Sequence, residues 1–340
     1  MIGRKKDFGI RHRGSHPEGW ARGNTTLKRV LAPVLQHSAM LGPRLSVGTT
    51  SAVLILVLSA LPPVRLFAQG DLDRLALRFA SMTAVTGLEQ AMVDSLRALF
   101  PGSTRDHVGN VTLTLGQGSP KRLFTCPLDE VGYVVGNILP DGFLLLRRVG
   151  GGGAGRTASP LFDQQLEGHR VTVFGARGAV PGVVAVKSTH LTRGRSAPGA
   201  PDPVFTLDNA YVDVGASSAA EVQGLGIAVL APVSLAKRPQ LYGERLLAAP
   251  VAGRRAACAA LAAAVQAKPK VKGTVVVALT VQSLYTSNAG LASVKALLGP
   301  FDDIKTAALA ARYADTAVET VALADADRLV RGILQWMEGR

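Results

Sequence analysis

The spacing of apolar residues constrains the fold most, and it changes twice along the chain. Residues 72–131 and 243–340 combine helical spacing of apolar side chains with buried strands, whereas residues 132–242 hold only short apolar segments separated by turns. Short strands at such spacing are typical of a small antiparallel barrel. The sequence therefore predicts an α/β domain that is interrupted by an inserted small β-barrel domain and completed after it.

The periodicity also predicts individual elements. Helical spacing within 72–100 is broken at 86–87, which indicates two helices, and further helices are predicted at 254–265 and 323–337. The run at 274–281 is rich in β-branched residues, as expected of a buried strand. The predicted strands are 111–115, 122–125 and 274–281 in the α/β domain, and 133–135, 143–146, 171–174 and 182–186 in the insert.

The first 68 residues carry +8 of the net charge of +14, and they contain an apolar run at 52–61. This arrangement predicts a targeting region with a signal peptide over about 40–68, cleavage before Gln69, and a periplasmic or secreted protein. The run is too short to span a bilayer, so an uncleaved membrane anchor is the alternative. The remaining chain shows no basic stripe with interleaved aromatics, and no nucleic-acid partner is expected.

Two cysteines, Cys126 and Cys258, follow the predicted cleavage point. Two small buried hydrophobic side chains are the favoured interpretation, and a disulfide is the alternative in an oxidising compartment. No Cys/His spacing resembles a zinc site. The glycine run at 150–155 lacks the lysine and the strand–loop–helix setting of a phosphate loop, so it is interpreted as a loop, as is the segment 192–203.

An acidic pair, Asp129 and Glu130, follows the predicted buried strand at 122–125. Carboxylates at the end of such a strand often belong to a metal or catalytic site. Structural ion pairs are commoner than catalytic ones, so pairing with Arg254 or Arg255 is the favoured interpretation.

Four segments carry a resemblance to a known family: 106–111, 181–184 with Lys187 and His190, 211–218, and 280–282. They resemble the glutamyl aminopeptidase family, which includes the tetrahedral aminopeptidases and the cellulase M-like proteins. The resemblance implies a mixed sheet of the phosphorylase/hydrolase type with helices on both faces, and an inserted barrel through which family members self-associate. It also implies aminopeptidase activity with two zinc or cobalt ions. Only 32 positions separate Ser283 from Asp315, fewer than in the family, which predicts a truncated α/β domain.

The chain departs from the family at the positions that carry the chemistry. Proline has no lone pair for a metal ion, and glycine and leucine offer no donor atom. We therefore expect a degenerate member with no metal cofactor and no catalysis, and we expect Arg254 to act as a compensating cation beside the retained carboxylates. The family ligand positions are Pro127, Gly253, Leu284 and Asp315, the general-base position is Ser283, and the retained acids outside the ligand set are Asp129 and Glu130.

These expectations predict an exported protein that has lost its metal site and catalysis and is kept as a binding or self-assembly module. Its partners are then further copies of itself, with peptides as the other candidate. An active aminopeptidase with an atypical site is the rival interpretation, supported by Asp129, Glu130 and Asp315 alone. A decaying gene product is the third.

Overall fold

The computed structural model describes residues 69–150, 160–185, 205–285 and 288–340. The predicted targeting region 1–68, the motif residues Lys187 and His190, and the predicted loop 192–203 lie outside the described residues. By their internal contacts, all the described residues belong to one compact unit.

A five-stranded mixed sheet forms the centre of the α/β part, in the order β1–β2–β12–β3–β13. The strands β3 and β12 are almost entirely buried, as expected for strands covered on both faces. β12 runs parallel to β3 and antiparallel to β2, and β13 runs parallel to β3. The strand bounds are β1 Thr104–Arg105, β2 Val111–Gly116, β3 Lys121–Pro127, β12 Thr274–Thr280 and β13 Asp303–Thr306.

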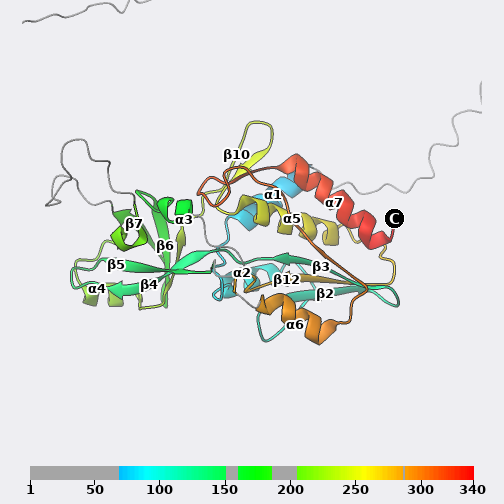
Figure 1. Cartoon of the computed structure of the whole chain (residues 1–340), viewed down its shortest axis with the longest axis horizontal. Helices are drawn as coiled ribbons and strands as arrows, with labels where there is room; N and C mark the ends of the chain where they lie inside the picture. Colours follow the sequence, from blue (N-terminus) through cyan, green and yellow to red (C-terminus); the bar gives the residue numbers. More distant parts are fainter. Residues whose placement is uncertain (1–68, 151–159, 186–204, 286–287) are drawn as a thin grey trace, which may run out of the picture. The chain divides into compact units, whose positions relative to one another are not determined.

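Helices cover both faces of this sheet (Figure 1). The helices α1, α5 and α7 share one large core with the sheet, and α6 packs on the opposite face through Val294. α5 is alanine-rich and buried along most of its length, which lets it lie close to its neighbours. The helix bounds are α1 Gln69–Ala80, α2 Gln90–Arg97, α5 Ala252–Gln266, α6 Ala289–Leu298 and α7 Leu323–Glu338.

The insert forms a closed barrel in the order β4–β5–β8–β7–β6–β9. Its interior is filled by alternate side chains of the strands, including Tyr133, Val173 and Val233. Short helices, α3 (Pro160–Gln164), η1 (Leu207–Asn209) and α4 (Ala219–Gly224), connect the strands. The barrel strands are β4 Gly132–Ile138, β5 Leu144–Val149, β6 Arg170–Gly175, β7 Gly178–Ala185, β8 Tyr211–Asp213 and β9 Pro232–Leu235.

These elements confirm the predicted α/β fold with an inserted barrel, but one predicted boundary moves. β10 (Gln240–Tyr242) was expected inside the insert, and it instead pairs with β11 (Leu246–Ala248) and, through it, with β14 (Thr320–Ala322). The barrel strands therefore end at Leu235 rather than at residue 242. No helix in the described ranges has the length and apolar character needed to cross a membrane.

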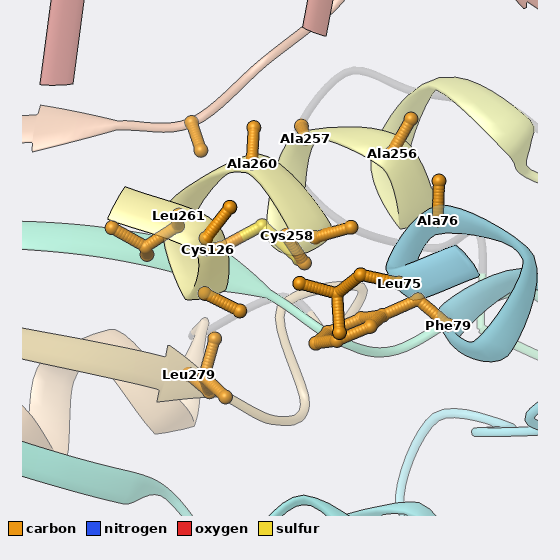
Figure 2. Close-up of a cluster of buried hydrophobic side chains, with 14 of the residues drawn as sticks. Leu75, Ala76, Phe79, Cys126, Ala256, Ala257, Cys258, Ala260, Leu261 and Leu279 are labelled. Atoms are coloured by element: carbon orange, nitrogen blue, oxygen red, sulfur yellow. A yellow bond between two sulfur atoms is a disulfide. The ribbon is translucent and has the colours of Figure 1, made fainter. Parts of the chain in front are cut away.

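A disulfide joins Cys126 at the end of β3 to Cys258 in α5, so the favoured interpretation of two unpaired thiols is wrong. Both cysteines are fully buried, and the sulfurs lie within the apolar core beside Leu75, Phe79 and Leu261 (Figure 2). The two residues are 132 positions apart in the sequence, so only the packing of α5 against β3 brings them together.

We expect a Cys126→Ala/Cys258→Ala variant to lose about 2–5 kcal/mol of unfolding free energy, because the cross-link restricts the unfolded chain over a long loop. Urea unfolding followed by circular dichroism measures this loss. The native protein, unfolded with and without a reductant in the denaturant, serves as the control. Equal stability of the variant and the native protein would contradict a disulfide in solution.

Candidate functional site

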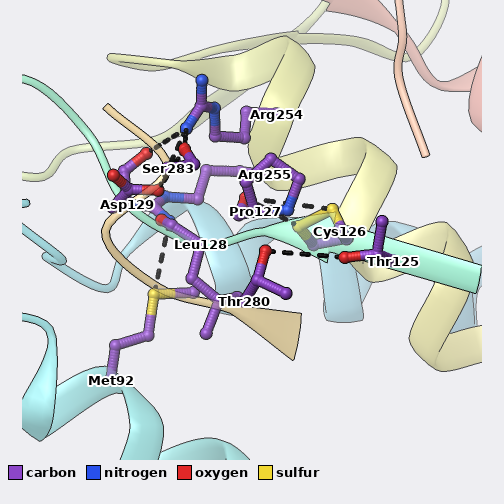
Figure 3. Close-up of a disulfide and its surroundings, with 11 residues drawn as sticks. Met92, Thr125, Cys126, Pro127, Leu128, Asp129, Arg254, Arg255, Thr280 and Ser283 are labelled. Atoms are coloured by element: carbon purple, nitrogen blue, oxygen red, sulfur yellow. Dashed lines mark hydrogen bonds and ion pairs between the residues drawn. A yellow bond between two sulfur atoms is a disulfide. The ribbon is translucent and has the colours of Figure 1, made fainter. Parts of the chain in front are cut away.

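The carboxyl ends of β3 and β12 lie side by side and bring two distant segments together. Pro127 is opposite Thr280 in the parallel register, and the backbone N–H of Leu128 donates to the carbonyl of Thr280 at 2.7 Å. The segments that follow both strands therefore enter the same space, which places Asp129 beside Ser283 (Figure 3). This is the edge at which open α/β sheets carry their sites.

Asp129 is completely buried and is held by hydrogen-bond donors from two segments of the chain. Its Oδ1 accepts from Ser283 Oγ at 2.5 Å, and its Oδ2 accepts from Thr86 Oγ1 and from the backbone N–H of Leu284, each at 2.9 Å. A buried carboxylate without such donors would carry a large desolvation cost. The hydrogen bonds explain how Asp129 can remain inside the protein.

Arg254, in the first turn of α5, supplies a positive charge to the same group. Its Nη1 donates to the Asp129 carbonyl at 2.5 Å and to Ser283 Oγ at 3.1 Å, and it lies 3.4 Å from Asp129 Oδ1 (Figure 3). Arg254 thus lies within ion-pair distance of Asp129, one of the two acids that were expected to face it.

Glu130 forms a second buried ion cluster. Its Oε2 lies 2.6 Å from Lys237 Nζ and 3.0 Å from Arg255 Nη2, and its Oε1 accepts from the backbone N–H of Ala84 at 3.1 Å. Arg255 also donates to the carbonyl of Leu128. Lys237 follows the last barrel strand, and no feature of its local sequence marked it as a partner of Glu130.

Burial raises the pKa of Glu130, but the charges of Lys237 and Arg255 outweigh this effect and hold the pKa below its ordinary value of 4.5. Glu130 is therefore ionised at neutral pH and acts as the anion between two buried cations. The charge of the Glu130 carboxylate is already neutralised by fixed partners. This carboxylate is therefore suited to holding the segments around it in place.

A cavity of about 140 Å³ adjoins both ion clusters. Glu130, Arg254, Leu284 and Asp315 line it together with Lys237, so four of the predicted site residues meet there with a cation that the sequence had not indicated. Apolar side chains of the barrel, including Phe162 and Leu235, form another part of its wall. Neither Pro127 nor Gly253 lines this cavity.

Gly253 instead contacts the segment that precedes β14. Its backbone N–H donates to Glu319 Oε1 at 2.8 Å, and a Cβ at this position would lie only 3.0 Å from the carbonyl oxygen of Leu309. Burial raises the pKa of Glu319, whereas backbone hydrogen bonds from Gly253 and Asp315 oppose the rise. Glu319 was missed at the sequence level, where an acid before a short strand looks like an ordinary turn residue.

A further buried acid, Glu89, lies near Asp129 and was also missed. Its Oε1 accepts from the backbone N–H of Gln282 at 2.8 Å, and burial raises its pKa, with Asp129 adding to the effect. Its place at the start of a predicted helix offered no indication of a role in the site. Glu89 thus fixes the segment that carries Ser283.

The Glu130→Gln substitution should destabilise the fold by about 3–5 kcal/mol, because it leaves Lys237 and Arg255 buried without an anion. Glu167→Gln, at an exposed position, is the matched control and should change stability little. Urea denaturation at pH 7 measures both. A loss for Glu130→Gln as small as that of the control would show that the cluster is solvated.

The same group predicts a pH dependence. The pKa of Glu130 is lower in the folded state than in the unfolded state, so its stabilisation is fully present above about pH 4.5 and is lost as the pH falls through the folded-state pKa. The stability difference between the native protein and Glu130→Gln should therefore shrink below pH 4.5. A difference that is constant down to low pH would contradict this assignment.

Comparisons with known proteins agree with this architecture. The sequence profile of the M42 glutamyl aminopeptidase family matches residues 109–283, slightly more than half of the chain. The aminopeptidase-like protein SgcX of Escherichia coli is 31% identical over 185 residues, covering 52% of this chain and 46% of SgcX. The lysyl aminopeptidase of Pyrococcus furiosus is 28% identical over 143 residues, covering 42% and 38%. The chain thus spans about half the length, or less, of the curated relatives that it matches.

Solved structures support the fold. An aminopeptidase from Desulfurococcus kamchatkensis superposes with a TM-score of 0.64 at 19% identity, covering 80% of this chain and 96% of the other. The TET1 peptidase of Pyrococcus horikoshii, which can assemble into a tetrahedron or a large octahedral shell, gives 0.61 at 19% identity, covering 78% and 99%. At this identity the likeness establishes the fold alone.

The comparisons contradict the expectation of no metal cofactor, because the matched family is one of dinuclear-metal aminopeptidases. The side chains that the resemblance placed at the ligand positions do not by themselves form a ligand set. Pro127, Gly253 and Leu284 offer no donor atom, and no group of three or more His, Cys, Asp or Glu that could hold a metal occurs within the described ranges. No catalytic step can therefore be derived for a metal ion from these residues. By its matched profile and its fold, the chain belongs to the M42 glutamyl aminopeptidase family.

Proposed function

We propose that this chain is an exported M42-family protein whose cleft at the ends of β3 and β12 has lost peptide hydrolysis, and that it acts as a binding or self-assembly module. The hydrogen bonding of Ser283, at the general-base position, carries the proposal. A general base must accept a proton from the attacking water. The Ser283 hydroxyl instead donates to Asp129 and accepts from Arg254.

The surrounding groups support the same conclusion. Asp129 is engaged by Ser283, Thr86 and the backbone of Leu284, so both of its carboxylate oxygens already have donors. Arg254 occupies the space beside this carboxylate, and it is held there by two further contacts to the Asp129 carbonyl and the Ser283 hydroxyl. Hydrolysis would require these groups to separate, whereas they stabilise one another in a buried setting.

Self-assembly is the role that the relatives favour for a chain of this fold. The TET1 peptidase of Pyrococcus horikoshii forms tetrahedral or octahedral shells, and a related structure contains a dodecamer. Assembly depends on surfaces rather than on the residues of a catalytic cleft. It can therefore persist in a protein whose cleft is filled by ion pairs.

An active aminopeptidase with an atypical site is the second candidate, and one observation favours it. Glu319 accepts a hydrogen bond from the backbone of Gly253, and Asp315 lines the cavity that Arg254 also lines. Carboxylates are thus available near the cleft even though the family positions are altered. Activity measurements separate the two candidates.

We expect the purified chain to hydrolyse no aminoacyl-amide substrate above the uncatalysed rate, with or without added zinc or cobalt, because Ser283 cannot act as a general base. Asp129→Asn is the matched variant, since it would remove activity if this carboxylate took part in catalysis. Turnover that added metal raises and Asp129→Asn abolishes would overturn the proposed loss of catalysis and support the active aminopeptidase.

Export is supported by the buried disulfide between Cys126 and Cys258, because disulfides persist in oxidising compartments. Protein recovered from the native host should begin near Gln69, since the apolar run at 52–61 resembles the core of a signal peptide. N-terminal sequencing of the recovered protein tests this. A start at Met1 or Met40 on a membrane-bound species would support the uncleaved anchor instead.

A further inference from the structure

The strand β13 forms one edge of the five-stranded sheet. It pairs with β3 on one side, and no strand in the described ranges pairs with its other side. Its residues are Asp303, Ile304, Lys305 and Thr306, of which the last three are exposed. An edge of this kind presents backbone donors and acceptors that another strand can pair with.

The direction of these backbone groups follows from the pairing with β3. The N–H of Ala307, just after β13, donates to the carbonyl of Thr125 at 2.8 Å, in step with the parallel register of Thr306 with Thr125. Backbone groups alternate along a strand, so Asp303 and Lys305 also direct their N–H and C=O groups toward β3, whereas Ile304 and Thr306 direct theirs outward. An added antiparallel strand would therefore form its close hydrogen-bonded pairs at positions 304 and 306.

The side chains make this edge complementary to itself. In an antiparallel pair of two β13 strands related by a two-fold axis at Ile304, Asp303 of each copy lies opposite Lys305 of the other. The two Asp303–Lys305 pairs carry no backbone hydrogen bonds in this register, and Ile304 forms a hydrogen-bonded pair with its own counterpart at the centre. A lysine on an edge strand commonly blocks pairing, but here the same register supplies an aspartate for each lysine.

The faces of the sheet fit the same arrangement. Ile304 is level with Leu123, so its side chain is on the face that α6 covers, and it is 37% exposed. On α6 itself, Leu297 is 56% exposed. Its ten residues contain one charged side chain, Lys295, which is few for a helix that faces water on its outer side. A second copy placed along β13 would bring a second apolar α6 to this face.

On the opposite face of the sheet, a residue of α7 holds Asp303 in position. Asp303 Oδ2 accepts from Trp336 Nε1 of α7 at 2.8 Å, and the Trp336 ring packs edge-on against Phe124 of β3. A carboxylate has a second oxygen that can accept from a lysine across the axis. The aspartate is therefore fixed at the edge before any partner arrives, which lowers the entropy cost of the pair.

We propose that β13 is a self-association edge, at which a second copy of this chain adds its own β13 in antiparallel register about Ile304 and continues the sheet across the dimer. The inference rests on the proposed self-assembly and names the surface that performs it. That surface belongs to the α/β part. The resemblance had instead suggested assembly through the barrel.

Charge reversal tests the pairing. Lys305→Glu places a carboxylate opposite Asp303 at both ends of the paired segment, so two attractions become repulsions and the dimer should weaken by about tenfold. Asp303→Lys should weaken it similarly by opposing two lysines. A mixture of the two variants restores an opposite-charge pair at each end and should recover the dimer. Lys270→Glu, at an exposed loop position, is the matched control and should leave the dimer unchanged.

These assemblies are measured on the full chain by sedimentation velocity over a range of concentrations, with circular dichroism to verify folding. Asp303→Lys also removes the bond to Trp336, so its folding must be verified before its assembly is interpreted. Lys305 is exposed, and its substitution leaves the bond between Asp303 and Trp336 in place. The result for Lys305→Glu can therefore be interpreted without the result for Asp303→Lys.

A cysteine cross-link tests the register independently. The two Ile304 side chains would lie opposite each other in a hydrogen-bonded pair, at a Cα separation of about 5.5 Å, which a disulfide can bridge. Ile304→Cys should therefore form a covalent dimer on mild oxidation. Thr306→Cys, on the same face, would lie opposite residue 302 and should not cross-link. The native cysteines do not interfere, because both are in the buried disulfide.

The outcomes separate this inference from the proposed function. A native protein that is monomeric at all concentrations would overturn the proposed self-assembly and this surface with it. A native assembly that Lys305→Glu leaves intact, or in which Thr306→Cys cross-links as readily as Ile304→Cys, would overturn the β13 surface alone. Loss of the dimer in both single variants, with recovery in the mixture, supports the two-fold pairing.

Discussion

The parallel pairing of β3 with β12 is the constraint on which the rest of the site depends. The pairing aligns Pro127 with Thr280, so the chain leaves both strands at the same edge of the sheet. Asp129 and Ser283 meet there because each lies two or three residues beyond its strand. The disulfide from Cys126 then joins β3 to α5, the helix that carries Arg254 and Arg255. A shift in the β3–β12 register would separate all of these groups.

Burial of charge gives this edge its specific arrangement. Asp129 and Glu130 are both almost inaccessible to solvent, and each is matched by nearby cations and hydrogen-bond donors. The desolvation cost of a buried carboxylate makes an unmatched alternative unfavourable, so these partners specify how α5 sits on the strand ends. The partner of Glu130 at Lys237 extends the same requirement to the segment after the last barrel strand.

Much of the fold was predictable because it depends on local periodicity. The helices α5 and α7 and the strand β12 coincide with the predicted segments to within two residues, since apolar spacing reflects which face of an element is buried. The short barrel strands were identified by the turns between them. The site was predictable only in part. The pair of Arg254 with Asp129 followed from the family resemblance, whereas Lys237, Glu319 and Glu89 had no local pattern that marked them.

The sequence by itself determined the types of element, their order along the chain, and the absence of side-chain donor atoms at Pro127, Gly253 and Leu284, because these are properties of single residues and short windows. The tertiary structure alone decided that Cys126 bonds to Cys258, that Lys237 neutralises Glu130, and that β13 forms an edge of the sheet. Each of these depends on the distance and burial of groups far apart in the chain. Those quantities are set by how the whole core packs, and no local pattern contains them.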